Sequence, residues 1–301
     1  MCLFMNTTAH ADNDTPISVI GLGLMGQALV GAFLKSGIRT TVWNRSPEKA
    51  RTLVENGAVL AATAADAVAA APLIVVCVTD YDVAHAVLDP LADALRGKTV
   101  VNLTSGHSEG ARDTARWAAE HGVKYLDGAI MAIPPVIGTE HASLLYAGPQ
   151  EVFDAHEATL ASLGRATHLG DDHGLASLYD VALLGIMWGV LNSFLHGVAL
   201  LETANVKAGA FAPLANDWIG AVTNFVSAYA GQIDEGSYPA HDATIDTHWA
   251  TMVHLIHESE ATGASAELPT FVKELTDRAI AAGRGGDSYA AMIEQFRKRT
   301  T

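Results

Sequence analysis

Cysteine and basic residues are both scarce in this sequence of 301 residues. Its two cysteines, Cys2 and Cys77, cannot build a disulfide framework or a cysteine-rich zinc site, which favours an intracellular protein. There are 18 Lys and Arg against 33 Asp and Glu, and the formal net charge is −15. A field of that sign repels nucleic acid and anionic membrane surfaces. We therefore expect a cytoplasmic protein without a nucleic-acid or membrane partner, in which any anionic ligand needs a local cluster of cations.

Long hydrophobic runs are missing as well. The most apolar stretch, residues 181–191, has about half the length that a bilayer-crossing helix needs, and we expect it to form a buried helix. The N-terminus has no cationic segment ahead of its few apolar residues, so it does not have the pattern of a signal peptide. We interpret residues 1–14 as a flexible tail.

Short apolar runs alternate with helical patterns up to Leu169. With 50% hydrophobic and 17% charged residues, the chain can bury a sizeable core and is not intrinsically disordered. Continuous apolar runs are typical of buried parallel strands, and their alternation with helices indicates right-handed βαβ units. We therefore predict an α/β fold with a doubly wound parallel sheet. The predicted strands are 16–21, 40–43, 73–78, 99–103, 124–126, 143–147 and 166–169.

The pattern changes after Leu169. Residues 174–204 contain no Lys, Arg or Pro, and apolar residues recur there at helical spacing. Such a helix is apolar on too many faces to be covered by one neighbouring domain, so it should be buried between two domains or two chains. No strand pattern follows it. We predict an α/β domain at 15–169, an interdomain helix at 170–204 and a helical domain at 205–301.

A glycine-rich turn follows the first predicted strand and opens a helix at 24–36. It fits G-x-G-x-x-G, in which the first glycine permits a tight turn, the second admits a pyrophosphate and the third lets the helix pack on the sheet. The free N–H groups of the helix then bind the anion. A glycine-rich turn without a ligand is the alternative. The residues expected to bind a dinucleotide here are Gly21, Leu22, Gly23, Leu24, Met25 and Gly26.

About twenty residues further on, an NAD-selective site carries an acid that binds the ribose 2′-hydroxyl. This chain has Asn44, Arg45 and Ser46 instead, with Lys49 one helical turn later. Arg45 can pair bidentately with a 2′-phosphate, and Ser46 and Lys49 add a neutral donor and a second cation. An ordinary solvated turn is the alternative. We predict NADPH as the cofactor, and its expected site also includes Val78, Thr79 and Ser105.

Several segments resemble the imine reductases, and the similarity covers most of the chain. They are GLGLMG (21–26), VWNRSPEKA (42–50), NLTSG (102–106), AIMAIPPVIG (129–138), LLYAGP (144–149) and HLGDDHGLASLYDVALLGIMWG (168–189). The resemblance implies a Rossmann domain, a long interdomain helix and an all-α C-terminal domain that completes a homodimer. The helical domains are then reciprocally swapped, so that each active site lies between two chains. The implied reaction is hydride transfer from NADPH to the C=N carbon of cyclic imines or iminium ions, giving chiral amines, with reductive amination of ketone–amine pairs as a further activity.

The related β-hydroxyacid dehydrogenases carry a catalytic lysine in a G-x-x-x-K-x-x-N motif. Here the motif begins at Gly174, and Leu178 stands at the lysine position. No lysine occurs between Lys124 and Lys207, and reduction of an oxo-acid needs a group that moves the hydroxyl proton. A reductase of small oxo-acids and a non-enzymatic NADP-binding redox sensor remain the alternatives.

The same resemblance places a proton donor at Asp171 and a partner hydroxyl at Tyr179. A carboxyl group in an apolar cleft can deliver a proton near neutral pH, and an ionised one can stabilise an iminium cation; both roles stay open for Asp171. Asp171 and Asp172 also compete for the N-cap of the apolar helix. Tyr179 is alternatively a core aromatic residue.

Histidines offer two further candidates. The resemblance suggests that His241, which follows a break between helical stretches, reaches over the partner's cleft and binds substrate. His254 and His257 have the spacing of a metal-binding pair, but no third ligand is evident in the sequence, and we predict no metal.

Overall fold

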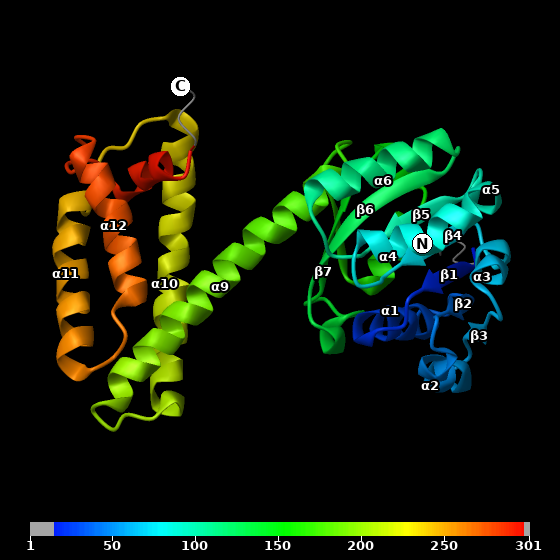
Figure 1. Cartoon of the computed structure of the whole chain (residues 1–301), viewed down its shortest axis with the longest axis horizontal. Helices are drawn as coiled ribbons and strands as arrows, with labels where there is room; N and C mark the ends of the chain where they lie inside the picture. Colours follow the sequence, from blue (N-terminus) through cyan, green and yellow to red (C-terminus); the bar gives the residue numbers. More distant parts are fainter. Residues whose placement is uncertain (1–14, 298–301) are drawn as a thin grey trace, which may run out of the picture. The chain divides into compact units, whose positions relative to one another are not determined.

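The structure is a computed structural model that describes residues 15–297. Contacts divide the chain into two units, one up to Gly185 and one from Ile186 onward, and the division falls inside the long helix. The tail predicted at 1–14 lies outside the described residues. Figure 1 shows the order of the elements along the chain.

The first unit contains an eight-stranded sheet in the order β3-β2-β1-β4-β5-β6-β7-β8. Its strands are β1 (Ile17–Ile20), β2 (Thr40–Trp43), β3 (Val59–Leu60), β4 (Leu73–Val76), β5 (Thr99–Asn102), β6 (Lys124–Met131), β7 (Ser143–Ala147) and β8 (Arg165–His168). The predicted α/β class and the doubly wound Rossmann sheet are confirmed. The two-residue edge strand β3 was not predicted, and β6 is longer than the predicted 124–126.

The expectation of an all-parallel sheet is wrong in one place. Strand β7 pairs antiparallel with β6, and β8 then runs parallel to β7. The residues between β6 and β7 form a short loop with one turn of 3-10 helix, η3 (Pro134–Val136). Parallel strands are joined by a longer crossover, usually an α-helix, whereas this loop, which the structure describes throughout, contains no α-helix and returns the chain in the opposite direction.

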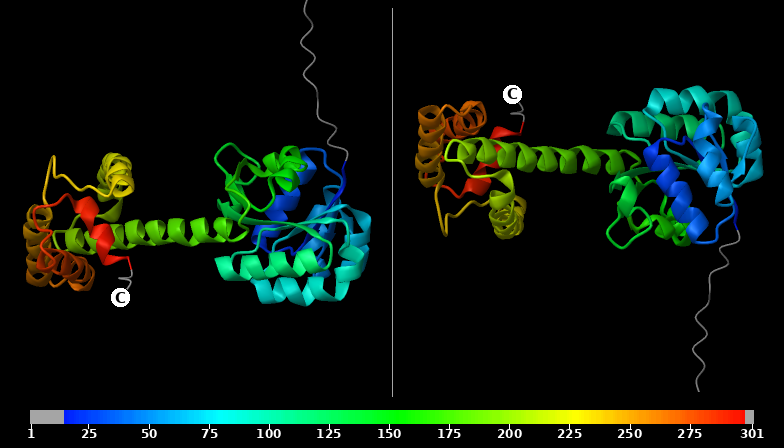
Figure 2. Two further views of the ribbon diagram at one scale, coloured as in Figure 1. Left: turned by 90° about the horizontal axis from the view of Figure 1, so that it is seen from above. Right: turned by 90° about the horizontal axis from the view of Figure 1, so that it is seen from below.

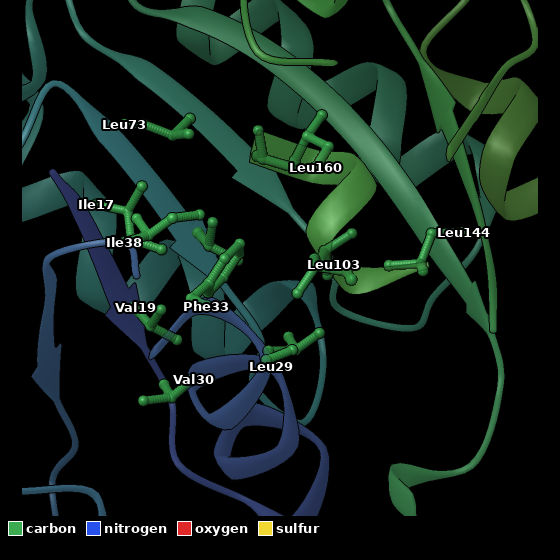
Figure 3. Packing of buried hydrophobic residues seen from close by; sticks show 14 of the residues in the cluster. Ile17, Val19, Leu29, Val30, Phe33, Ile38, Leu73, Leu103, Leu144 and Leu160 are labelled. Carbon is green, nitrogen blue, oxygen red and sulfur yellow. The ribbon is translucent and has the colours of Figure 1, made fainter. Parts of the chain in front are cut away.

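Helices cover both faces of this sheet (Figure 2). Alternate strand residues point to opposite faces, so Val19 joins the cluster around α1 while Ile20 joins the cluster around α4 and α6. Figure 3 shows Leu29 and Phe33 of α1 packed on the sheet. The helices are α1 (Leu24–Lys35), η1 (Pro47–Ala50), α2 (Arg51–Glu55), α3 (Ala64–Ala70), α4 (Tyr81–Leu88), η2 (Asp89–Leu91), α5 (Ala92–Leu95), α6 (Ser108–Glu120), α7 (Gln150–Asp154), α8 (Glu157–Leu160) and η4 (Ala161–Leu163).

The second unit is entirely helical in its described part. It contains the C-terminal half of α9 (Gly174–Glu202), then α10 (Ala208–Glu235), α11 (Ile245–Thr262), α12 (Glu267–Ala281) and η5 (Tyr289–Gln295). Its buried cluster comes from α11, α12 and η5 and comprises Ile245, Leu275, Ala279, Ala291 and Met292. The predicted all-α C-terminal region is thus confirmed.

Helix α9 is less buried within one chain than we expected. Only 22% of its most apolar stretch is buried among the described residues. By length and composition α9 could cross a membrane, but a long core helix passes the same test, so this is weak evidence for a membrane span.

Candidate active site

The carboxyl ends of β2, β1, β4 and β5 form one row across the sheet, which continues to Asp127 in the middle of β6. Strand pairing aligns Ile20 with Val76, Val76 with Asn102, and Asn102 with Asp127. The row begins at Trp43 of β2 and changes from apolar to polar side chains as it crosses from β4 to β5. In open α/β sheets, ligands bind outside this edge, so the row marks where a site should form.

The glycine-rich turn after β1 has the geometry that a phosphate needs. Gly21 has a φ of 99°, a conformation that favours glycine, and a Cβ at Gly26 would overlap the Gly21 carbonyl. Nothing in the described chain lies within 4 Å of a Cβ built on Gly23. Internal packing therefore explains two of the glycines, whereas the space at Gly23 is left for a ligand.

The amino end of α1 is prepared for an anion. Gly23 is its N-cap and provides no side chain to cap the helix, and the first turn contains no acidic residue. The N–H groups and the helix dipole therefore face the turn without competition from a carboxylate.

Asn44 links this turn to the loop after β2. Its Oδ1 accepts a hydrogen bond from the Leu22 backbone N at 2.9 Å, and its Nδ2 donates to the Ser46 carbonyl at 3.0 Å. Both ends of the amide are used in shaping the turn, so a supporting role fits Asn44 better than direct contact with a phosphate. Arg45 and Lys49 remain exposed beside it as the cations of the loop.

One cavity of about 600 Å³ collects these residues. All the predicted cofactor residues except Ser105, which is exposed on the loop after β5, line it. A size of several hundred Å³ suits a cofactor, and the open glycine, the helix terminus and two cations match the pyrophosphate and 2′-phosphate of NADPH. The sequence prediction missed five other lining residues, which form mainly an apolar wall: Trp43, Cys77, Val83, Ala86 and Val87.

The two aspartates before α9 have different roles. Asp172 accepts a hydrogen bond from the Gly174 N at 3.0 Å and pairs bidentately with Arg112 of α6, at 2.8 and 2.7 Å. The hydrogen bonds from Arg112 lower the pKa of Asp172 to about 2. Asp172 is therefore the capping residue, and Asp171 is released from that task. Asp171 is exposed and accepts one long hydrogen bond, at 3.3 Å, from the Gln150 N.

Tyr179 lies on the outward side of α9, 49% exposed. Ser177 and Asp180 are buried on the inward side of the same turns. Tyr179 is therefore not part of the buried core that one chain forms. Asp171 and Tyr179 belong to the same unit and are both exposed, and their catalytic roles stay predictions.

A buried carboxylate in the row was not predicted. Asp127 accepts hydrogen bonds from the hydroxyls of Tyr81 (2.6 Å), Tyr125 (2.9 Å) and Ser177 (3.0 Å). Burial raises the pKa of Asp127 to about 7, although the three hydroxyls oppose that rise. The only signal in the sequence is an aspartate inside an apolar run, which coincides with the end of the predicted strand 124–126.

The histidine candidates lie in the second unit. His241 is exposed in the segment between α10 and α11, and its substrate contact stays a prediction. Among residues 15–297, no group of three or more His, Cys, Asp or Glu side chains is placed to hold a metal ion.

The sheet, the turn and the cationic loop define a Rossmann-type dinucleotide-binding protein. Residues 16–170 match the family model of the NAD binding domain of 6-phosphogluconate dehydrogenase, and residues 172–298 match that of the NADPH-dependent reductive aminase-like C-terminal domain. The NADPH-dependent reductive aminase of Aspergillus oryzae is 39% identical over 285 residues, which are 93% of this chain and 97% of that protein.

Solved structures agree. The reductive aminase of Aspergillus terreus, in complex with NADPH4, cyclohexanone and allyl amine, is 40% identical and has a TM-score of 0.88, covering 94% of this chain and 100% of that one. The imine reductase of Streptomyces aurantiacus is 34% identical with a TM-score of 0.90 and the same coverage. The chain therefore belongs to the family of NADPH-dependent reductive aminases and imine reductases, and the resemblance seen in the sequence is confirmed.

Proposed function

We propose that this chain is an NADPH-dependent imine reductase. It transfers hydride to the C=N carbon of cyclic imines or iminium ions to give chiral amines, and it also carries out reductive amination. The start of α9 carries this proposal: Leu178 occupies the lysine position of the oxo-acid reductases, while Asp171 is free of the helix cap. Similarity to a reductive aminase solved with a ketone and an amine supports the same substrates.

NADPH is the cofactor, and when bound it supplies the hydride. The turn at Gly23 and the amino end of α1 would hold its pyrophosphate, and Arg45 and Lys49 would hold its 2′-phosphate. Asp171 either gives a proton to the substrate nitrogen or, when ionised, stabilises the cation. Tyr179 orients that nitrogen by hydrogen bonding.

The active enzyme is a homodimer in this proposal. Large apolar side chains stay exposed on α9 and α10 in the single chain, which is costly in water. A second copy that packs its helical domain around α9 would bury them and would desolvate the exposed Asp171. His241 then contacts the substrate, and the enzyme is cytoplasmic. The exposed side chains include Ile186, Trp188, Leu195, Leu214, Trp218 and Val226.

Steady-state assays test the reaction. The full-length protein is given 1-pyrroline, then cyclohexanone with allylamine, then a small oxo-acid such as glyoxylate, each with NADPH or NADH. We expect turnover of the imine and of the ketone–amine pair, with NADPH preferred. Turnover of the oxo-acid alone would establish the dehydrogenase alternative. Tight NADPH binding without any turnover would establish the redox sensor.

Two substitutions test the catalytic roles. Asp171→Asn and Tyr179→Phe should each lower kcat for the imine, by about 100-fold and about 10-fold, because general acid catalysis contributes about 10²–10⁴-fold. The dissociation constant for NADPH should stay within a factor of about three. Lys35→Ala, a surface change on α1, serves as the control. Full activity in both variants would remove the support for this assignment.

A further inference from the structure

The buried carboxylate of Asp127 joins three separate elements of the first unit. Its hydrogen-bond donors are Tyr81 at the start of α4, Tyr125 on β6 and Ser177 on α9. The hydroxyls of Tyr81 and Ser177 also lie 3.2 Å apart. A substitution at Asp127 would therefore loosen the attachment of α9 to the sheet.

The same network extends to the cofactor cavity. Asn102 donates to the Tyr125 hydroxyl at 3.1 Å and accepts from the Thr104 N at 3.2 Å. The Thr104 hydroxyl in turn accepts from the Val78 N at 3.2 Å, and Val78 lines the cavity. An unbroken chain of hydrogen bonds thus connects the cofactor loop with α9.

Ser177 determines the direction in which Tyr179 points. A helix turns 100° per residue, so Tyr179 lies about 200° around α9 from Ser177. Ser177 is buried and Tyr179 is 49% exposed, as this rotation requires. A rotation or shift of α9 at Ser177 would move the Tyr179 hydroxyl by a similar amount.

Burying Asp127 lowers the stability of the fold, which argues against a purely structural role. No ion pair in residues 15–297 includes it, and a buried charge without a cation lowers stability. Space is also reserved for its partner Tyr81, because a Cβ on Gly106 would overlap the Tyr81 ring. Buried polar groups of this kind can fix one arrangement among several apolar alternatives.

We propose that Asp127 is a positioning residue of the active site, which holds α9 in the register that directs Tyr179 to the substrate and ties it to the cofactor loop. This inference rests on the proposed function of Tyr179. Asp127 itself touches neither substrate nor cofactor in this account; it acts through Ser177.

A double-mutant cycle on imine turnover tests the coupling. Asp127→Asn should lower kcat about ten-fold in the wild-type background but less than about three-fold when Tyr179→Phe is already present, since the positioned hydroxyl is then gone. Ser177→Ala should repeat this pattern, and Ser177→Thr, which keeps a hydroxyl, should restore most of the activity. Equal losses in both backgrounds would overturn the proposal, because a general loss of folding does not depend on Tyr179.

A readout without catalysis separates this inference from the proposed function. Amide hydrogen exchange of the full-length protein should become at least about ten-fold faster at residues 174–182 in Asp127→Asn and in Ser177→Ala. Tyr146→Phe is the matched control, because it alters a buried tyrosine of the same sheet outside the network. Unchanged exchange at 174–182 would overturn the anchoring role even if imines are reduced. Faster exchange in a protein that reduces no imine would refute the proposed function and leave the anchoring intact.

Discussion

The two units of the chain differ in how completely each one buries its apolar side chains and pairs its buried polar groups. In the first unit, apolar residues fill both faces of the sheet, and buried polar groups such as Asp127 and Asn102 have partners. In the second unit, the buried cluster is small, and long helices keep large apolar side chains such as Trp188 and Trp218 exposed. The first unit buries most of its apolar core within one chain, whereas the second unit leaves many large apolar side chains without a cover.

This difference between the units indicates where the cofactor and a second chain would bind. In the first unit, the glycine-rich turn and the cationic loop line the cavity where the proposed cofactor binds. Apolar groups collect on α9 and α10, where the proposed second chain binds. Stability of the helical unit should therefore depend on protein concentration, and stability of the sheet unit should not.

The largest effect is expected from a charge on the exposed face of α9. Ile186 is 62% exposed in the single chain, so Ile186→Asp would be tolerated if that face stayed in water. If a second copy packs on that face, the new carboxylate would be buried in the interface without a partner, and the dimer should dissociate. We expect sedimentation to show a monomer of 31.5 kDa and imine turnover to fall by about 100-fold or more.

Val59→Asp is the matched control for this change. Val59 is also 62% exposed, but it lies on the edge strand β3 of the first unit and not on α9 or α10. This variant should remain dimeric and active. A dimeric, fully active Ile186→Asp protein would contradict both the proposed interface and the contrast between the two units.

A smaller effect is expected in the cofactor loop of the first unit. Arg45→Ala should raise KM for NADPH by about 10–100-fold, as expected for loss of hydrogen bonds to a charged group, and should leave KM for NADH nearly unchanged. Arg51→Ala, which removes a cation outside the cavity lining, is the control. An equal rise in KM for both cofactors would show that Arg45 does not bind the 2′-phosphate selectively.

The sequence predicted the elements of the first unit well because its signals are local. The strands at 40–43 and 143–147 agree with β2 and β7, and the glycine turn adopts the expected geometry. The antiparallel direction of β7 depends on the path of the loop between β6 and β7, which the apolar pattern of the strands does not indicate. Ser105 is not part of the cavity lining, and its contact with the cofactor stays a prediction.

The polar network could not be predicted, because its members are far apart in sequence. Tyr81, Asp127 and Ser177 meet only when β6 aligns with β5 and when α4 and α9 cover the same edge. The spacing of these three residues in the sequence does not indicate that they meet in the fold. The roles of the two aspartates were left open for the same reason, since Arg112, which settles the cap, lies 60 residues away from Asp172.

The pH dependence of stability tests whether the first unit tolerates its buried charge. The pKa of Asp127 is raised from 3.8 to about 7, so between these pH values the folded state holds a proton that the unfolded state has lost. Stability should therefore fall as pH rises from about 4 to 7, by on the order of 4 kcal/mol, since each pKa unit corresponds to about 1.4 kcal/mol.

Asp127→Asn isolates this contribution, because other titrating groups are common to both proteins. The stability lost on substitution should shrink as pH rises from 5 to 8. Asp172, whose pKa is lowered by Arg112, contributes its stability above its unfolded pKa and loses it only as pH falls toward 2, outside this range. Urea unfolding at pH 5, 6, 7 and 8 measures the difference. A difference that does not change with pH would contradict the burial of an ionisable carboxyl.

The smallest effect on the free energy of unfolding is expected from Tyr146→Phe. The informative comparison is with Tyr125→Phe. Both side chains are buried in the same sheet, but the Tyr125 hydroxyl donates to Asp127 and accepts from Asn102, whereas the Tyr146 hydroxyl has no hydrogen-bond partner among the described residues. Tyr125→Phe leaves a buried donor without a partner and should cost about 1–3 kcal/mol. Tyr146→Phe removes an unpaired polar atom, so the free energy of unfolding should stay the same or rise by up to about 1 kcal/mol. Urea unfolding of the two variants at pH 7 measures both changes. Equal effects would mean that the hydrogen-bonded hydroxyl of Tyr125 contributes no more than the unpaired hydroxyl of Tyr146, and the network around Asp127 would lose its energetic basis.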